Sequence, residues 1–400
     1  MMYSLPLREE APLSKLTKGS NSKLALDTLI LKVASRCNLN CSYCYMYNLA
    51  DSGWKLQPKF MSNETVALVI ERWRSHLIDK NPPARLHLIL HGGEPLLAGP
   101  ERFDHWITLI RRDLCKAGIP VSIGIQSNGL LLNDELCEVL CRHGVRVGIS
   151  IDGIPGKGDQ FRVDHNGVPS GRRLEDKLLW LADSPWAACF GGMLSVVNIE
   201  SDPIETLEYI LKFSPARLDF RLPLCNHDSP PARPIWDFDK SSYGRWLARV
   251  FDYVVDRDVQ TQVRILDAVI NSGINPDAYQ NMIGNTELTQ ACVIETDGTY
   301  ELVDNLKSIK DGMTRTGMSV RTDSLDDYCA FAAGWRKHHG LENLSSLANT
   351  CLECELYSQC NGFFYAHRYS SSTLFSNESV YCSDVRFLFN HVNRRLKGGD

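Results

Sequence analysis

The sequence predicts an α/β protein, a partial or complete barrel of six strand-helix units followed by a small cysteine-rich domain. Between about residues 27 and 260, short runs of β-branched apolar residues alternate with amphipathic stretches, a pattern typical of a parallel sheet. Beyond about residue 285 the apolar runs shorten and cysteines gather, so we expect this part to need a metal for stability. At 400 residues the chain is also longer than one core of typical size.

Each expected strand is a short apolar run, and the strands occupy 28–33, 85–90, 121–126, 145–150, 190–197 and 217–222. Between the strands, the segments 64–79, 102–118 and 133–144 show the periodicity of amphipathic helices, and Asn133 is the expected N-cap of the last one. A loop rich in proline, aspartate and serine, 226–242, precedes a further helix at 243–258. In a barrel of this kind the active site lies at the C-terminal ends of the strands.

These patterns divide the chain into an N-terminal tail (1–26), a core (27–260), a helical linker (261–290) and a C-terminal domain (291–400). The formal net charge of -5 offers no bulk field that would attract nucleic acid or an anionic membrane. The N-terminal stretch has no apolar signal region, and no window approaches the roughly 20 apolar residues of a membrane helix. We therefore expect a cytoplasmic protein, in which clustered cysteines are metal ligands rather than disulfides.

The first cysteine cluster, "CNLNCSYC", places Cys37, Cys41 and Cys44 in the loop after the first strand. Thiolates are the usual ligands of cubane iron-sulfur clusters, and three of them leave one of four irons open to another ligand. The alternative is a zinc knuckle, which needs a fourth ligand nearby. The nearest histidine, His76, is distant in the sequence.

The spacing CxxxCxxC, with an aromatic residue before the last cysteine, resembles the radical SAM superfamily. "HGGEP" (91–95), "QSNG" (126–129) and "SIDG" (150–153), each at the end of an expected strand, are similar to further motifs of that family. The resemblance implies a radical SAM barrel of the partial (β/α)6 type, with a [4Fe-4S] cluster on the three cysteines that binds S-adenosylmethionine. It implies cofactor contacts from Tyr43, Gly92, Gly93, Glu94, Ser127, Asn128, Ser150 and Arg162.

Within this set, Glu94 is expected to receive the methionine ammonium group, and Arg162 to hold the cofactor carboxylate or to position the substrate. For Ser127 and Asn128 the alternative is simple loop capping, and for Arg162 it is a surface salt bridge.

The second cluster, Cys351, Cys354, Cys360 and Cys382, is a complete four-thiolate set. It resembles the second auxiliary cluster of SPASM domains, although a structural zinc site remains an alternative. The family has two further cysteines where this chain has Val303 and Phe364, so we expect one auxiliary [4Fe-4S] cluster. Cys292 and Cys329 are expected to be unligated. The remaining cysteines are expected to be buried, inert thiols: Cys115, Cys137, Cys141, Cys189 and Cys225.

The segments 218–231, 295–308, 360–370 and 377–382 resemble the subset of these enzymes that forms three-residue cyclophanes in ribosomal precursor peptides, although "CNGF" stands where that subset commonly has "CGGG". The implied reaction joins a side-chain β-carbon to an aromatic ring and releases one proton and one electron. The candidate bases are Asp219, His227, Asp228 and Asp304.

The implied partners are a precursor peptide and a reducing electron donor such as flavodoxin or ferredoxin. Two other readings stay open. One is a different peptide modification, either thioether formation or sulfatase maturation, although a sulfatase-maturing enzyme would be expected to keep both auxiliary clusters. The other is a non-catalytic iron-sulfur electron carrier or a zinc-stabilised scaffold.

Overall fold

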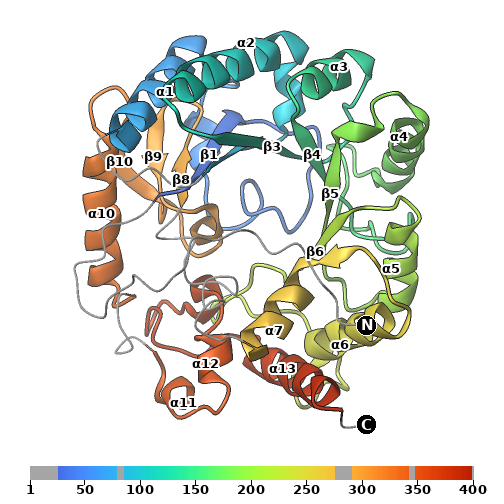
Figure 1. Ribbon diagram of the computed structural model, residues 1–400. Helices are drawn as coiled ribbons and strands as arrows, with labels where there is room; N and C mark the ends of the chain where they lie inside the picture. The colour runs from blue at the N-terminus through green and yellow to red at the C-terminus, as the bar shows by residue number, and fades with distance from the viewer. Residues whose placement is uncertain (1–25, 79–84, 275–290, 342–346, 399–400) are drawn as a thin grey trace.

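The computed structural model describes residues 26–78, 85–274, 291–341 and 347–398. Within these residues the strands form one ten-stranded sheet in the order β10-β9-β8-β1-β2-β3-β4-β5-β6-β7 (Figure 1). Neighbours from β8 through β1 to β7 are parallel, while β9 runs antiparallel to β8 and β10. The sheet does not close, so the barrel is partial, as expected. The N-terminal tail 1–25 and linker residues 275–290 lie outside the described residues.

All six predicted strands are present, each within two residues of its expected ends. The strands are β1 Thr28–Ala34, β2 Leu86–Gly92, β3 Val121–Ser127, β4 Arg146–Ser150, β5 Phe190–Val196, β6 Arg217–Arg221, β7 Gln262–Val263, β8 Ala291–Ile294, β9 Thr299–Glu301 and β10 Arg315–Ser319.

The helices are α1 Asn63–Ile78, α2 Pro100–Ile110, α3 Asp134–Arg142, α4 Gly171–Asp183, α5 Pro203–Leu211, α6 Ser242–Asp256, α7 Arg264–Ile274, α10 Leu325–His338, α11 Asn349–Leu352, α12 Tyr357–Cys360 and α13 Cys382–Leu396. The four helices expected at 64–79, 102–118, 133–144 and 243–258 are α1, α2, α3 and α6. The helix expected at 102–118 ends as an α-helix at Ile110 and continues as a π-helical turn, Arg111–Cys115. Asn133 caps α3 as predicted, accepting a hydrogen bond from the Leu136 amide at 2.9 Å.

The two faces of the sheet differ in composition. On β2 the leucines at 86, 88 and 90 are fully buried, whereas the intervening residues, which end with His91, are half-buried. The buried set packs against the surrounding helices; on β6, for example, the Phe220 ring lies 5.0 Å from that of Trp246 in α6. Figure 1 shows the helices α1 to α6 on the outside of the strands. The alternate residues therefore line the inner face, which carries Lys32, His91, Gln126, Ser150, Asp219 and Arg221.

The C-terminal segment extends the same sheet. β8 pairs with β1 in parallel, from Thr28 opposite Ala291 to Leu31 opposite Ile294. α10 lies beside β10 and contacts α1, whereas α12 and α13 lie beside α7, and α13 packs closely on α6 because Gly244 has no side chain there. A Cβ atom on Gly244 would lie 2.2 Å from the Asp384 carbonyl oxygen.

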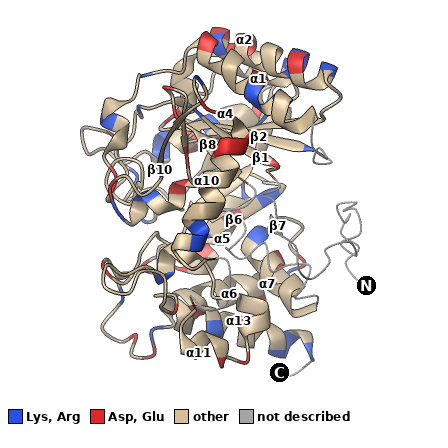
Figure 2. Ribbon diagram, turned by 90° about the vertical axis from the view of Figure 1, so that its left-hand side faces the viewer, with Lys and Arg blue, Asp and Glu red and all other residues tan. Residues whose placement is uncertain are grey.

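Charges of both signs are interspersed along the helices on the side that Figure 2 presents. No helix within the described residues has the length and apolar character that crossing a membrane requires.

A buried arginine joins the core to the C-terminal helix. Arg233, in the loop before α6, donates to Asp237 at 2.8 Å and to Asp384 of α13, and both carboxylates are almost fully buried. Asp237 also accepts bonds from the Ser241 and Ser242 amides, at 2.8 and 3.1 Å, so the same group caps α6. Removing the arginine would leave two buried carboxylates without their counter-ion.

We expect Arg233→Met to lower the free energy of unfolding by about 3–5 kcal/mol, because breaking a buried ion pair leaves uncompensated charge. Arg249→Met is the matched control, since Arg249 lies on α6 and pairs with the partly exposed Asp202 at 2.9 Å. The control should change stability by about 1 kcal/mol or less. Urea unfolding of both variants measures the difference, and equal losses would contradict a special role for the Arg233 bridge.

Candidate active site

The cysteine loop follows β1 directly and is fixed at both ends. The Cys44 amide donates to the Cys41 carbonyl at 3.0 Å, which closes a turn. The amides of Asn40 and Ser42 donate to the carbonyls of Val163 and Phe161, at 2.7 and 3.0 Å. The loop is therefore held against the connection between β4 and α4, at the C-terminal end of the strands.

The three thiols lie close enough to raise one another's pKa, although burial is the larger cause. The pKa of Cys37 is raised to about 12 and that of Cys41 to about 11, with Arg162 opposing the rise at Cys41. The Leu39 amide and the Asn128 side-chain amide donate to the Cys37 sulfur, at 3.3 and 3.8 Å. Thiolates at this site thus need nearby positive charge, which the irons of a cluster supply.

No group of three or more His, Cys, Asp or Glu side chains in the described part of the chain is arranged around a single metal ion. Thiolates on one cubane cluster are bound by separate irons, so they need not converge on one point. The three-thiolate loop with its N–H donors to sulfur fits such a cluster.

The glycines of "HGGEP" allow the end of β2 to approach the chain that leads to Cys37. The Gly93 amide donates to the Ala34 carbonyl at 2.8 Å, and the next amide donates to the Arg36 carbonyl at 2.9 Å. A Cβ atom on Gly93 would lie 2.5 Å from the Arg36 oxygen, and Gly92 has a φ of 146°, which disfavours any side chain. The glycine pair therefore fits β2 against the cysteine loop.

Glu94 forms the centre of a buried hydrogen-bond network. Its Oε1 accepts from the Leu96 amide at 3.0 Å and from the Ser127 hydroxyl at 2.7 Å, and its Oε2 accepts from the Asn128 amide at 2.8 Å. Burial raises the pKa of Glu94, and these three bonds oppose the rise. Ser127 and Asn128, which we expected to contact the cofactor, are thus joined to Glu94. Oε2 keeps a lone pair for a further donor.

Arg162 lies in a second buried network, with Tyr43 and Asp152. Its Nη1 donates to the Tyr43 hydroxyl at 3.0 Å, and that hydroxyl donates to Asp152. Arg162 is buried, and its Nε atom has no partner in the structure. Asp152 was not among the predicted site residues, although it is the aspartate of the "SIDG" motif. Ser150 of the same motif accepts from Gln126 at 2.9 Å.

Asp304 is held inside the barrel by a lysine that the sequence analysis did not identify. Lys32, fully buried on the inner face of β1, forms an ion pair with Asp304. The lysine also contacts His91 Nδ1, at 3.1 Å, and the Tyr45 hydroxyl donates to Asp304 at 3.5 Å. Burial alone would raise the pKa of Asp304, but Lys32, with smaller effects from Lys307 and His91, keeps it below its ordinary value. The carboxylate is thus ionised at neutral pH.

The structure does not bring the other three candidate bases into this group. Asp219 lies on the inner face of β6, where Arg221 and Arg264 bind it at 2.8 and 2.9 Å. His227 is exposed, and its Nε2 bonds to the Glu378 carbonyl at 2.7 Å. Asp228, also exposed, accepts from the Ser371 amide at 2.8 Å. The last two connect the loop after β6 to the C-terminal segment.

The four C-terminal cysteines come together at the ends of α11, α12 and α13. Burial raises the pKa of Cys360 to about 12, and the thiols of Cys382, Cys351 and Cys354 add to the rise, so the four lie near one another. The Arg368 side chain is buried close to Cys351 and Cys360, and its Nε has no partner. A cation here suits a group with several thiolates, which fits the expected auxiliary cluster.

At the two positions where the resemblance to SPASM domains led us to look for further cysteines, the side chains are apolar. Val303 is buried in the core, and Phe364 packs partly buried against it. Cys292 is fully buried, and its thiol interacts with the Cys329 thiol and with the Tyr328 side chain. Neither Val303 nor Phe364 offers a thiolate to a metal.

The expectation of buried, inert thiols is wrong for Cys141, Cys189 and Cys115. Cys141 of α3 and Cys189 before β5 are joined in a disulfide, with their Cα atoms 5.6 Å apart. Cys115 is exposed rather than buried. The pairing could not be predicted from local patterns because the two residues are 48 positions apart and meet only when α3 packs against the turn before β5.

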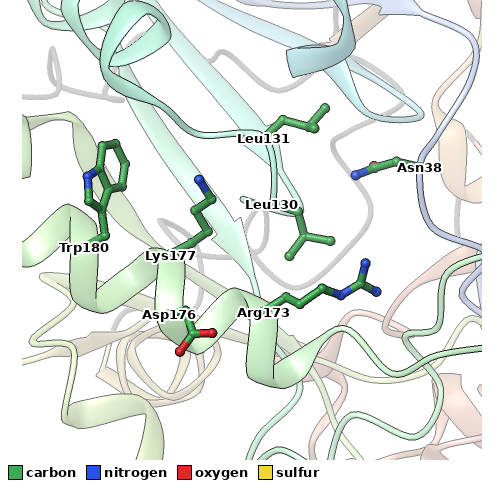
Figure 3. Close-up of a pocket in the computed structure, with 7 residues that line it drawn as sticks. All are labelled: Asn38, Leu130, Leu131, Arg173, Asp176, Lys177 and Trp180. Carbon is green, nitrogen blue, oxygen red and sulfur yellow. The ribbon is translucent and has the colours of Figure 1, made fainter.

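A cavity of about 500 Å³ lies beside the cysteine loop. Figure 3 shows Arg173, Lys177 and Trp180 of α4 on one side, with Leu130, Leu131 and Asn38 opposite. Lys177 donates to the Leu132 carbonyl at 2.8 Å and lies over the Trp180 ring, while Arg173 pairs with Asp164 at 2.9 Å. These cations are already engaged, so we assign the cavity no ligand.

The amino-acid sequence is similar to known proteins over part of the chain. Residues 31–210 match the model of the Radical SAM superfamily. A serine-type anaerobic sulfatase-maturating enzyme of Klebsiella aerogenes is 28% identical over 148 residues, which is 36% of this chain and 34% of that protein. An uncharacterised protein of Methanocaldococcus jannaschii is 33% identical over 147 residues, 36% of this chain and 44% of that protein. These matches therefore span less than half of the curated relatives.

Solved structures resemble the fold over a longer stretch. The structure of anSMEcpe with bound AdoMet and Cp18Cys peptide has a TM-score of 0.76 at 19% identity, covering 93% of this chain and 98% of that one. Streptococcus suis SuiB has a TM-score of 0.60 at 15% identity, covering 89% of this chain and 77% of that one. At these identities the likeness shows the fold.

We expect Glu94→Gln to lower the free energy of unfolding by about 1–3 kcal/mol. The glutamine side chain carries a donor NH2 group in place of one acceptor oxygen, so this group must face at least one of the N–H or O–H donors that now bind Glu94. Glu101→Gln is the control, since Glu101 is exposed in the first turn of α2. Guanidinium unfolding followed by circular dichroism compares the two. A Glu94→Gln protein as stable as the control would mean that the network around Glu94 does not stabilise the fold.

Proposed function

Because residues 31–210 match the model of the Radical SAM superfamily, we propose that the chain is a radical SAM enzyme that crosslinks a ribosomal precursor peptide, joining an aromatic ring carbon to a side-chain β-carbon. The observation that carries this proposal is Asp304, an ionised carboxylate on the inner side of the barrel whose Oδ1 has no partner. A crosslinked ring must lose a proton to regain aromaticity, and Asp304 is the base that the geometry offers.

The proposed crosslink forms one carbon–carbon bond in place of two carbon–hydrogen bonds. The β-carbon gives up a hydrogen atom and bonds to the ring carbon, and the ring then loses one proton and one electron. The peptide is therefore lighter by two hydrogens. When bound, the first cluster with S-adenosylmethionine supplies the hydrogen-abstracting radical, and the auxiliary cluster supplies a one-electron acceptor. We propose that Asp304 takes the proton at Oδ1.

The other residues have binding and positioning roles in this proposal. Cys37, Cys41 and Cys44 would hold the first cluster, and Cys351, Cys354, Cys360 and Cys382 would hold the auxiliary one. Glu94 Oε2 and the unpartnered Nε of Arg162 are the polar atoms left for the amino and carboxylate groups of S-adenosylmethionine. An external donor such as flavodoxin or ferredoxin would reduce the first cluster.

A peptide substrate is also supported by the related structures, since SuiB was solved bound to precursor peptide SuiA and anSMEcpe with a peptide. Sulfatase maturation is the second candidate, favoured by the names of several curated relatives. Those matches cover only about a third of this chain. The apolar packing at Val303 and Phe364 favours one auxiliary cluster and thus the crosslinking reaction.

Iron and sulfide analysis of the anaerobically reconstituted protein tests the cofactor assignment. We expect about eight irons per chain, falling to about four in the Cys37→Ala, Cys41→Ala, Cys44→Ala triple variant. About twelve irons in the wild type would contradict a single auxiliary cluster. About four irons falling to none, with zinc present, would make the C-terminal site structural.

Co-expression with the precursor peptide encoded beside the gene tests the reaction. Mass spectrometry should show the loss of two hydrogens, and NMR of the product should show a ring proton replaced by carbon. Asp304→Asn should still form deoxyadenosine but lose crosslinking by about 100-fold or more, the usual effect of removing a general base. Asp228→Asn, which alters an exposed loop carboxylate, is the control. Crosslinking at the wild-type rate in Asp304→Asn would exclude Asp304 as the base.

A further inference from the structure

We propose that Lys32 is the positioning residue for Asp304, holding one carboxylate oxygen so that the other, Oδ1, is left to accept the proton. The inference rests on the proposed function above, because it concerns the base of that reaction. Lys32 itself touches no reacting atom in this scheme and acts through the carboxylate.

All three hydrogen-bonding directions of the Lys32 ammonium group are used. It binds Asp304 Oδ2, His91 Nδ1 at 3.1 Å and the Met46 sulfur at 3.7 Å. An ammonium group has three N–H donors, so these contacts fix its position completely. The strand supplies the rest of the geometry, since Lys32 lies directly opposite His91 in the pairing of β1 with β2. The lysine is thus rigid, and no part of it is exposed.

The Asp304 carboxylate is bound on one side only. Oδ2 accepts from Lys32 and, at 3.5 Å, from the Tyr45 hydroxyl, whereas Oδ1 is buried without a partner. An acceptor left unpaired in a protein interior calls for an explanation, and a catalytic role is one of the recognised reasons. An oxygen that takes up a proton during the reaction must have a lone pair available beforehand.

Lys32 dominates the charge around Asp304. The groups that face Asp304 are Lys32 on β1, His91 on β2, Tyr45 in the cysteine loop, Lys307 three residues further along the chain and the carboxylate of Glu301 on β9. Burial and Lys32 lower the pKa of His91 to about 3, so the imidazole is neutral at physiological pH. Lys307 is shared with Glu295 and Glu301, which bind it at 3.0 and 2.5 Å. Lys32 is therefore the cation that determines whether Asp304 stays ionised.

The pairing is tested by infrared titration of the reconstituted holoenzyme, without any peptide. The C=O band of protonated Asp304, assigned by its absence in Asp304→Asn, should be missing in the wild type at about pH 5, above the ordinary pKa of aspartate. In Lys32→Met the band should appear at a pH higher by about 1–3 units, the usual effect of one adjacent opposite charge. The matched control is Lys307→Met, which removes a second buried lysine and should produce a smaller shift.

Two outcomes overturn the inference. One is a wild-type Asp304 that is protonated at about pH 5, a result that needs no variant and holds even if Lys32→Met fails to fold. The other is a C=O band of protonated Asp304 that appears at the same pH in Lys32→Met as in the wild type. Lys32→Arg adds a further test, because it restores the charge with a different geometry. Asp304 should remain ionised in Lys32→Arg while crosslinking falls relative to deoxyadenosine formation.

The result is separable from the proposed function. If the titration follows expectation but the co-expressed peptide is not crosslinked, the function is wrong and the Lys32–Asp304 pairing stands. If the peptide is crosslinked by a protein whose Asp304 titrates independently of Lys32, the positioning role is wrong and the function stands.

Discussion

β1 is the strand on which the rest of the molecule depends, because it is hydrogen-bonded on both sides, to β2 and to β8. One face of β1 packs into the core, while the other carries Lys32 toward the inside of the barrel. Its end leads into the cysteine loop. A shift of one residue in its pairing would exchange the two faces, placing leucines inside the barrel and the lysine in the core.

Buried ion pairs, as well as packing, determine the arrangement of the chain around the inner face of the sheet. Lys32 is opposed by Asp304, and Lys307 by Glu295 and Glu301, so two buried lysines are neutralised by acids of one C-terminal segment. Replacing a buried ion pair with apolar residues is often neutral or stabilising, so such pairs are weak evidence for stability alone. Here they determine which segment lies against β1 and leave one carboxylate oxygen unpaired inside the barrel.

Local patterns were sufficient to predict the six core strands, the Asn133 cap and the position of the cysteine loop. Each of these depends on residues close together in the chain. The contacts that were missed join distant positions: the pairing of β8 with β1, the ion pair of Lys32 with Asp304, and the bridge between Cys141 and Cys189. A lysine inside an apolar run gives no sign of its partner 272 residues away.

Contacts between residues far apart in the sequence also change the role predicted for polar residues of the motifs. Ser127 and Asn128 have the chemistry of cofactor ligands, and a motif at a strand end is a reasonable place for them. The structure uses both to hold Glu94, which follows a different strand. Residue type and position in a loop thus grouped these two residues with Glu94, but did not indicate which atoms remain available to bind a cofactor.

The separation of Lys32 and Asp304 has a consequence for biosynthesis. A ribosome produces β1 and the cysteine loop long before it reaches residue 304, so during that interval the lysine has no carboxylate opposite it. Burying an unpaired ammonium group is strongly unfavourable, which discourages the inner face from closing early. The site can mature only after the C-terminal segment docks beside β1. A prematurely terminated chain would keep this charge exposed, and cellular quality control can recognise such incompletely folded products.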